Sequence, residues 1–75
     1  MTYVESKKSL VEELKENFKN QGDKFIIYPN IDNSKYFEVI INDLVKEDYV
    51  AVRTKGLSGF YNLQLTGKFL TKHNL

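Results

Sequence analysis

Apolar side chains recur at helical spacing over the first 21 residues. One stripe carries Tyr3, Leu10, Val11, Leu14 and Phe18. Such a stripe predicts an amphipathic helix with one buried face. Two pairs, Thr2 with Glu5 and Ser9 with Glu12, have the spacing of a capping box, in which each side chain bonds the other residue's backbone N–H. Gly22 is placed to end the helix in a left-handed conformation.

A second helix is predicted from about Asn33 to Asp48. Its apolar residues have the spacing of one helical face: Phe37, Ile40, Ile41, Leu44 and Val45. We expect all of them to be buried, and either Asp32 or Ser34 to cap the helix. The opposite, exposed face would carry Lys35, Glu38, Asn42, Asp43 and Lys46.

The remaining apolar runs predict strands. Phe25–Tyr28, which Pro29 ends, is typical of a short strand. Alternation over residues 49–54 and 60–65, with Lys55–Gly59 between them, predicts a β-hairpin. Side chains expected to face the core are Val50, Val52, Tyr61, Leu63 and Leu65, and those expected to face outward are Ala51, Arg53, Phe60, Asn62 and Gln64. Gly67 breaks the alternation, and a short last turn is expected over residues 68–73.

Together these elements predict a single α+β domain over residues 1–75, with two main helices, a C-terminal hairpin and a short third strand. A hydrophobic content of 41% is enough for one core, and the absence of cysteine excludes disulfides and thiolate metal sites. No apolar run has the length of a signal peptide or approaches the roughly 20 residues that span a bilayer. We therefore expect a cytoplasmic protein with no membrane partner.

Charge is distributed unevenly along the chain. Residues 1–48 contain seven lysines and ten acids, a net charge of −3, whereas residues 49–75 contain four basic side chains and no acid, a net charge of +4. The overall charge of +1 gives no general attraction to a polyanion. The local excess at the C-terminal end does favour one, and it suggests a binding module rather than a catalyst.

The C-terminal half resembles a winged helix-turn-helix domain. Residues 35–50, from Lys-Tyr-Phe-Glu to Glu-Asp-Tyr-Val, are similar to that family's third helix running into a strand, with Asp48 where glycine is usual. Leu63, Gly67 and Leu70 match the spacing of the family's common ending, in which Gln64 replaces a threonine. The chain is similar to small YjcQ-like proteins of Gram-positive bacteria, which prophages and other mobile elements often carry. It departs from the family between its two predicted helices, where residues 22–32 replace a further helix.

The resemblance implies that the second helix reads DNA. Lys35, Asn42 and Lys46 would then meet phosphates and base edges. The same stretch, Asn33–Asp48, holds two lysines and four acids, a net charge of −2. Since phosphate contacts dominate DNA affinity, this helix is poorly suited to the major groove, and an ordinary amphipathic helix explains it as well.

The hairpin corresponds to the wing of that family, and it combines cations with an outward aromatic ring. Arg53, Lys55 and Phe60 would grip a nucleic-acid backbone and stack on a base, with Lys68 and Lys72 nearby. The same residue types also form protein-binding hot spots. A third interpretation is a solvated hairpin without a ligand, and the sequence leaves these alternatives open.

Ten aromatic residues are more than a core of this size needs. We expect Tyr28, Tyr36 and Phe60 to be partly exposed and to form a protein-interaction surface or a homodimer contact. Amphipathic tyrosines with their hydroxyls in water are an equal alternative.

Catalytic chemistry has little basis in the sequence. His73 is the sole histidine, no triad can be built on it, and no metal-ligand spacing or phosphate-binding loop occurs. We therefore expect no enzyme activity, no cofactor and no metal. The leading hypothesis is a nucleic-acid-binding accessory or regulatory protein of a phage or other mobile element, which contacts double- or single-stranded DNA mainly through the wing. The alternative is a non-catalytic adapter that binds a larger replication or transcription protein.

Overall fold

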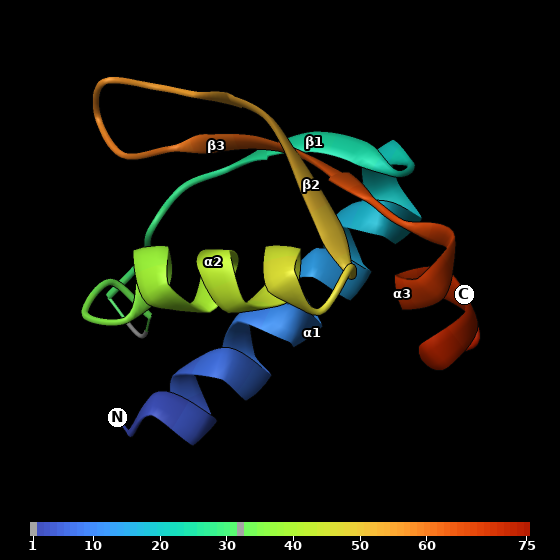
Figure 1. Cartoon of the computed structure of the whole chain (residues 1–75), viewed down its shortest axis with the longest axis horizontal. Helices are drawn as coiled ribbons and strands as arrows, with labels where there is room; N and C mark the ends of the chain where they lie inside the picture. The colour runs from blue at the N-terminus through green and yellow to red at the C-terminus, as the bar shows by residue number, and fades with distance from the viewer. Residues whose placement is uncertain (1, 32) are drawn as a thin grey trace.

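The computed structural model describes residues 2–31 and 33–75. Over these ranges the order of elements is α1 (Tyr3–Gln21), β1 (Lys24–Ile27), α2 (Phe37–Lys46), β2 (Val50–Lys55), β3 (Tyr61–Leu65) and α3 (Gly67–Lys72). The strands form one antiparallel sheet in the order β1-β3-β2. Figure 1 shows the sheet on one side of the molecule and the helices on the other. The predicted α+β class, the hairpin and the short third strand are confirmed.

The core lies between the inner face of the sheet and the helices. Its buried side chains are Leu10, Leu14, Phe25, Ile27, Phe37, Ile40, Ile41, Leu44, Val50, Tyr61, Leu63, Leu65 and Phe69. Two residues predicted for it are exposed instead, Val45 at 41% and Val52 at 40%. Val45 lies at the margin of the apolar face of α2. Val52 belongs to an edge strand, which has a neighbouring strand on one side only, whereas Leu63 lies in the central strand and is fully buried.

The first helix begins where its sequence predicts. The Thr2 hydroxyl accepts a hydrogen bond from the backbone N–H of Glu5 at 3.2 Å, and the Glu5 carboxylate accepts one from the Thr2 N–H at 2.9 Å. These bonds lower the pKa of Glu5, because they favour its charged form. The second predicted capping box, at Ser9, is wrong because α1 continues through it. Gly22 ends the helix at a φ of 85° and donates to the Phe18 carbonyl oxygen.

The second helix begins later than predicted, at Phe37 rather than Asn33. Asn30 and Asn33 accept hydrogen bonds from each other's backbone N–H through their side-chain oxygens, both at 3.0 Å. This reciprocal pair holds the chain in a turn, and the Asn30 amide also donates to Glu13 of α1 at 2.8 Å. Tyr36 occupies the N-cap position without a side-chain bond, so the prediction for Ser34 is wrong, while Asp32 lies outside the described residues.

The short last turn is a helix that folds back against the start of the hairpin. The Thr66 hydroxyl accepts from the Phe69 N–H at 3.3 Å and donates to the Asp48 carbonyl oxygen at 2.6 Å. This bond joins the beginning of α3 to the residue that precedes Tyr49 and β2. Across residues 2–31 and 33–75, none of the helices is long and apolar enough to cross a membrane.

Candidate nucleic-acid interface

A β-bulge separates the two cations of the predicted wing. Val52 pairs with Leu63 and Thr54 with Asn62, so the register passes over Arg53. The extra residue shifts the alternation beyond it. Lys55 therefore pairs with the inward-facing Tyr61 rather than lying on the outer face.

Lys55 is engaged within the fold. Its ammonium donates to the Glu38 carboxylate of α2 at 2.9 Å and lies 5.5 Å from the centroid of the Tyr61 ring. The Glu38 carboxylate raises the pKa of Lys55, because it stabilises the charged form. Arg53, by contrast, is exposed and takes part in none of the ion pairs found among the described residues.

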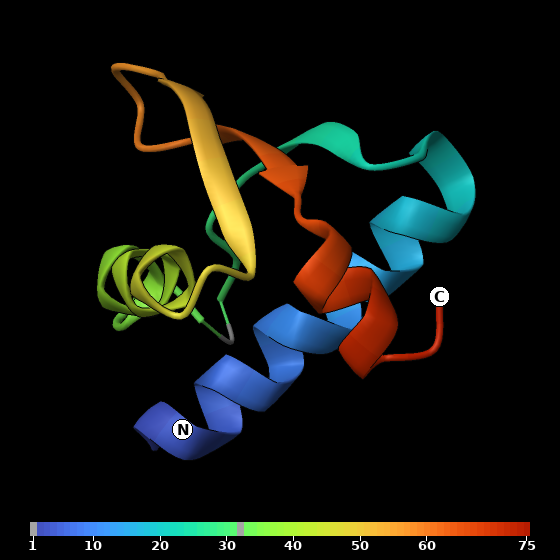
Figure 2. The ribbon, with the colours of Figure 1, turned by 45° about the vertical axis from the view of Figure 1, so that its right-hand side comes forward.

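The outer face of the sheet is formed by Lys24 and Ile26 of β1, Asn62 and Gln64 of β3, and Ala51 and Thr54 of β2. In register, Lys24, Gln64 and Ala51 form one row across the sheet, and Ile26, Asn62 and Thr54 form the next. Their neighbours along β1 and β3 are buried, so these side chains lie on the opposite side from the core. No acid belongs to this set. Figures 1 and 2 show the helices packed on the other side of the sheet, which leaves this outer sheet face uncovered.

An aromatic pair lies where β1 ends and β3 begins. The centroids of Tyr28 and Phe60 are 5.3 Å apart, and Tyr28 is 58% exposed. Phe60 is partly exposed as predicted, but its ring lies against Gly56 of the hairpin loop and is less accessible than that of Tyr28. A Cβ atom at Gly56 would be only 2.0 Å from its Cε1 atom, so the ring needs a glycine there. Tyr28 is thus the accessible member of the pair.

The lysines of α3 do not join the hairpin loop. Lys68 and Lys72 place their ammoniums 4.9 and 5.0 Å from the centroid of the Tyr49 ring. Lys68 also donates to the Glu47 carbonyl oxygen at 2.8 Å, and Lys72 to the Tyr49 hydroxyl at 2.9 Å. Tyr49 precedes β2 and lies six residues, or about 20 Å of extended strand, from Lys55. The prediction that these lysines lie near the wing cations is therefore wrong.

The polar residues predicted to read DNA from the second helix remain exposed. Lys35 precedes the helix, with its ammonium 5.3 Å from the Tyr36 ring, and Asn42 and Lys46 lie on the exposed side of α2. The acids of this segment hold neighbouring elements. Besides Glu38 with Lys55, Glu47 pairs with Lys7 of α1 at 2.8 Å. Asp43 accepts a hydrogen bond from the Tyr3 hydroxyl, which raises the pKa of that tyrosine.

The three aromatics predicted for protein interaction do not form one patch. Tyr28 contacts Phe60, whereas Tyr36 packs edge-on against Tyr3 of α1 at 5.8 Å. Sequence reasoning also missed Lys24 and Ile26 as members of a common surface. Alternation along Lys24–Ile27 would have assigned them outward, but the strand order that places them beside Gln64 and Asn62 is not visible in the sequence.

Comparison with known protein families, with curated proteins and with solved structures finds no match for this chain. Within the described ranges, no group of three or more histidine, aspartate or glutamate side chains is arranged to hold a metal ion.

Proposed function

We propose that this protein binds nucleic acid on the outer sheet face, with Arg53 and Lys24 contacting phosphates and Tyr28 stacking on a base. The observation that carries the proposal is an acid-free sheet face with Lys24 at one edge, the bulged and exposed Arg53 in the other edge strand, and an exposed aromatic ring at one end. Phosphates are attracted to such a surface, and no carboxylate of the set opposes them. An accessible aromatic ring adds a stacking platform that any base can use.

The side chains between the cations fit the same ligand. Asn62 and Gln64 lie on the central strand, and each carries both hydrogen-bond donors and an acceptor that can reach base edges or sugar oxygens. The sheet is uncovered on this side, and accessible aromatic and amide side chains suit unpaired bases more than the closed stack of a duplex. We therefore propose single strands as the preferred form.

The arrangement α1-β1-α2-β2-β3 supports the proposal that the fold is winged-helix-like, with β2 and β3 as the wing. In this proposal α2 does not read DNA, because its acids lie on the exposed side or fasten neighbouring elements. A role as an accessory or regulatory protein of a phage or other mobile element has the sequence resemblance as its support.

The test is a titration of fluorescent single-stranded and duplex oligonucleotides of random sequence, from about 50 to 200 mM salt. Arg53→Gln and Lys24→Gln should each reduce the slope of log affinity against log salt by about one. Tyr28→Ala should weaken single-strand binding by about 1–3 kcal/mol with little change in the slope, because it removes stacking rather than charge.

Lys46→Gln is the matched control, because it removes one exposed lysine from α2. It should leave the slope unchanged. An equal loss of slope in Lys46→Gln would instead assign binding to α2, and the absence of binding at about 50 mM salt would refute the proposal. An adapter that docks on a replication or transcription protein is the second candidate, and an apolar groove along α1 favours it.

A further inference from the structure

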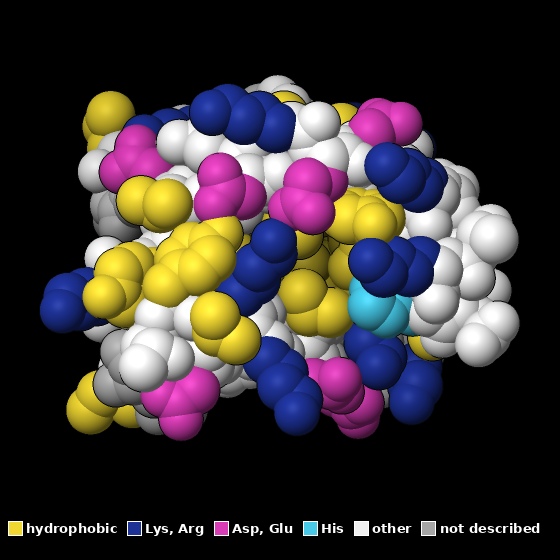
Figure 3. All heavy atoms as spheres, turned by 60° about the horizontal axis from the view of Figure 1, so that its bottom comes forward, with side chains coloured by type: hydrophobic (Ala, Val, Ile, Leu, Met, Phe, Trp, Pro, Cys, Tyr) yellow, Lys and Arg dark blue, Asp and Glu magenta, His cyan; other side chains and the backbone are white. Residues whose placement is uncertain are grey.

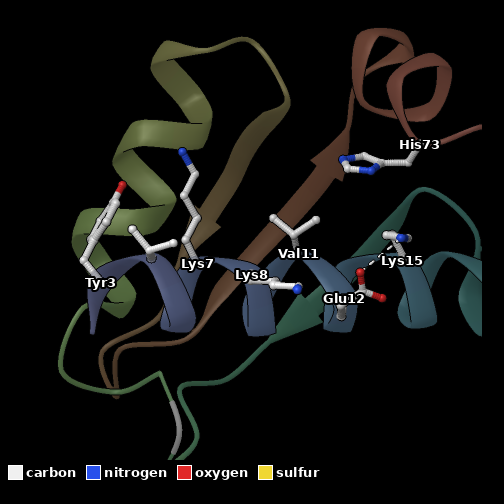
Figure 4. A pocket seen from close by; sticks show the side chains of 8 residues that line it. Tyr3, Lys7, Lys8, Val11, Glu12, Lys15 and His73 are labelled. Atoms are coloured by element: carbon white, nitrogen blue, oxygen red, sulfur yellow. Dashed lines mark hydrogen bonds and ion pairs between the residues drawn. The ribbon is translucent and has the colours of Figure 1, made fainter. Parts of the chain in front are cut away.

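A groove of about 470 Å³ runs along α1. In Figure 3 it is seen as a hollow with apolar side chains at its centre and with basic, acidic and histidine side chains around it. Figure 4 shows Tyr3, Lys7 and Val11 projecting from α1 on the side of the groove, and His73 facing them from the end of α3.

The apolar lining of the groove lies at the margin of the core, because Tyr3 and Val11 pack against the core from outside. The buried stripe of α1 consists of Ser6, Leu10 and Leu14. Val4, which lines the groove, is 73% exposed, and Val11 is half-buried. From Tyr3 to Lys15 the lining spans about 18 Å, or three helical turns. Its apolar members, Tyr3, Val4 and Val11, extend over about 12 Å, or two helical turns, in the direction of a helix packed alongside α1.

Lysines outnumber acids among the residues that line the groove itself, while Glu47 and Asp43 lie beside one of these lysines, Lys7. Lys7, Lys8 and Lys15 line the groove together with one acid, Glu12. Lys15 bonds the Glu12 carboxylate at 3.2 Å, and Lys7 bonds Glu47 at 2.8 Å, so ammoniums of the groove already hold carboxylates in the folded chain. Lys8 is exposed, and it takes part in none of the ion pairs formed within the described part of the chain.

We infer that this groove binds an acidic amphipathic helix of a partner protein. Apolar side chains on one face of that helix would cover Val4 and Val11, and carboxylates beside them would pair with Lys8 and share Lys7 and Lys15. A nucleic acid fits less well, because Val4 and Val11 offer its phosphates no hydrogen-bond donor, and Lys8 alone of the three lysines lies outside the ion pairs of the described residues. The inference is independent of nucleic-acid binding by the sheet, which lies on another side of the molecule.

A displayed library of helical peptides tests this inference on the full chain. Each peptide spans about three helical turns, with leucine on one face and Glu, Lys, Gln and Ala randomised elsewhere. Selection should enrich glutamate over lysine beside the leucines. Labelled protein should then show backbone amide shifts at Val4, Val11 and His73 when an enriched peptide binds.

Matched variants locate the site. Val4→Glu and Lys8→Glu change exposed residues of the groove, so both variants should fold normally. Each should lower the affinity for the enriched peptide by about tenfold. Val39→Glu and Lys46→Glu make the same changes on the exposed side of α2 and should leave its affinity unchanged. A circular-dichroism spectrum and a urea midpoint for each variant check folding.

Other outcomes would overturn the inference. These are a selection that enriches nothing, a selection that enriches lysine, and equal losses in the α2 variants. Amide shifts at Val4 and Val11 that respond to an oligonucleotide and not to the peptide would identify nucleic acid as the occupant. Because the peptide and the oligonucleotide are measured separately, failure of this inference is distinguishable from failure of the function proposed for the sheet.

Discussion

Two exposed surfaces carry lysines and exposed aliphatic side chains, yet they use charge differently. On α2 and its C-cap, Glu38, Asp43 and Glu47 each bind a side chain of another element. On the outer sheet face, Lys24 takes part in none of the ion pairs of the described chain, and neither does the bulged Arg53. The helix surface therefore fastens the fold, whereas the sheet surface leaves its cations open to a ligand.

The difference teaches that the availability of a cation matters more than its presence. Exposed ion pairs contribute only about 0–1 kcal/mol to stability, but they fix where a flexible lysine points. Lys55 illustrates this, because a bulge turns it toward Glu38 and away from Arg53, its neighbour in the predicted wing.

The largest expected effect concerns the inner side of α2. Ile41→Ala should lower the free energy of unfolding by about 2–5 kcal/mol, because a fully buried side chain leaves a cavity among core residues. Val45→Ala, at the exposed margin of the same helix, should cost much less. Urea denaturation of both variants measures the difference. Equal losses would mean that the helical face containing Ile41 does not pack against the core.

An intermediate effect is expected when the ion pair between α2 and the hairpin is removed. Glu38→Gln should release Lys55 and eliminate one carboxylate beside it, so single-strand affinity should rise and its salt slope should steepen. Glu16→Gln is the control, because it removes an exposed carboxylate of α1 that takes part in none of the ion pairs of the described residues. If both variants bind alike, Lys55 is not held away from the ligand by Glu38.

The smallest effect is expected from His73, which belongs to neither surface. Burial lowers its pKa, and Lys15 and Lys72 lower it further, while Glu12 opposes them. The unfolded chain then binds a proton at His73 more readily than the folded chain does. The contribution of His73 to stability is therefore present above the ordinary histidine pKa of about 6.5, and it is lost as pH falls below that value. The urea midpoint should fall more in the wild type than in His73→Gln between about pH 7.5 and 5.5. An equal fall would assign the pH dependence to carboxyl groups.

Periodicity predicted much of the fold, because burial of one helical face or one strand face follows directly from spacing. Ile40, Ile41, Leu63 and Leu65 are buried as expected. Spacing does not predict burial correctly in an edge strand of the sheet, as the exposed Val52 of β2 shows. It also fails at the start of α2, since the reciprocal bonds between Asn30 and Asn33 favour a turn over a helix.

The candidate site was harder to predict than the fold. Alternation predicts which side chains face outward only while each residue has a cross-strand partner. The bulge leaves Arg53 without one, and no glycine in this part of the strand indicates a bulge in the sequence. Lys68 and Lys72 depend on how α3 folds back to Tyr49, which local sequence does not determine. The outer sheet face depends on strand order, a property of the whole chain.

That strand order also has a consequence for how the protein is made. The central strand, β3, is the last of the described strands to be synthesised, and both β1 and β2 pair with it. Until Tyr61–Leu65 emerges, β1 has no neighbour and the hydrophobic faces of α1 and α2 have no sheet to cover them. Folding must therefore wait for contacts between distant parts of the chain, which are slow to form. A nascent chain shorter than this would expose its future core to chaperones and proteases.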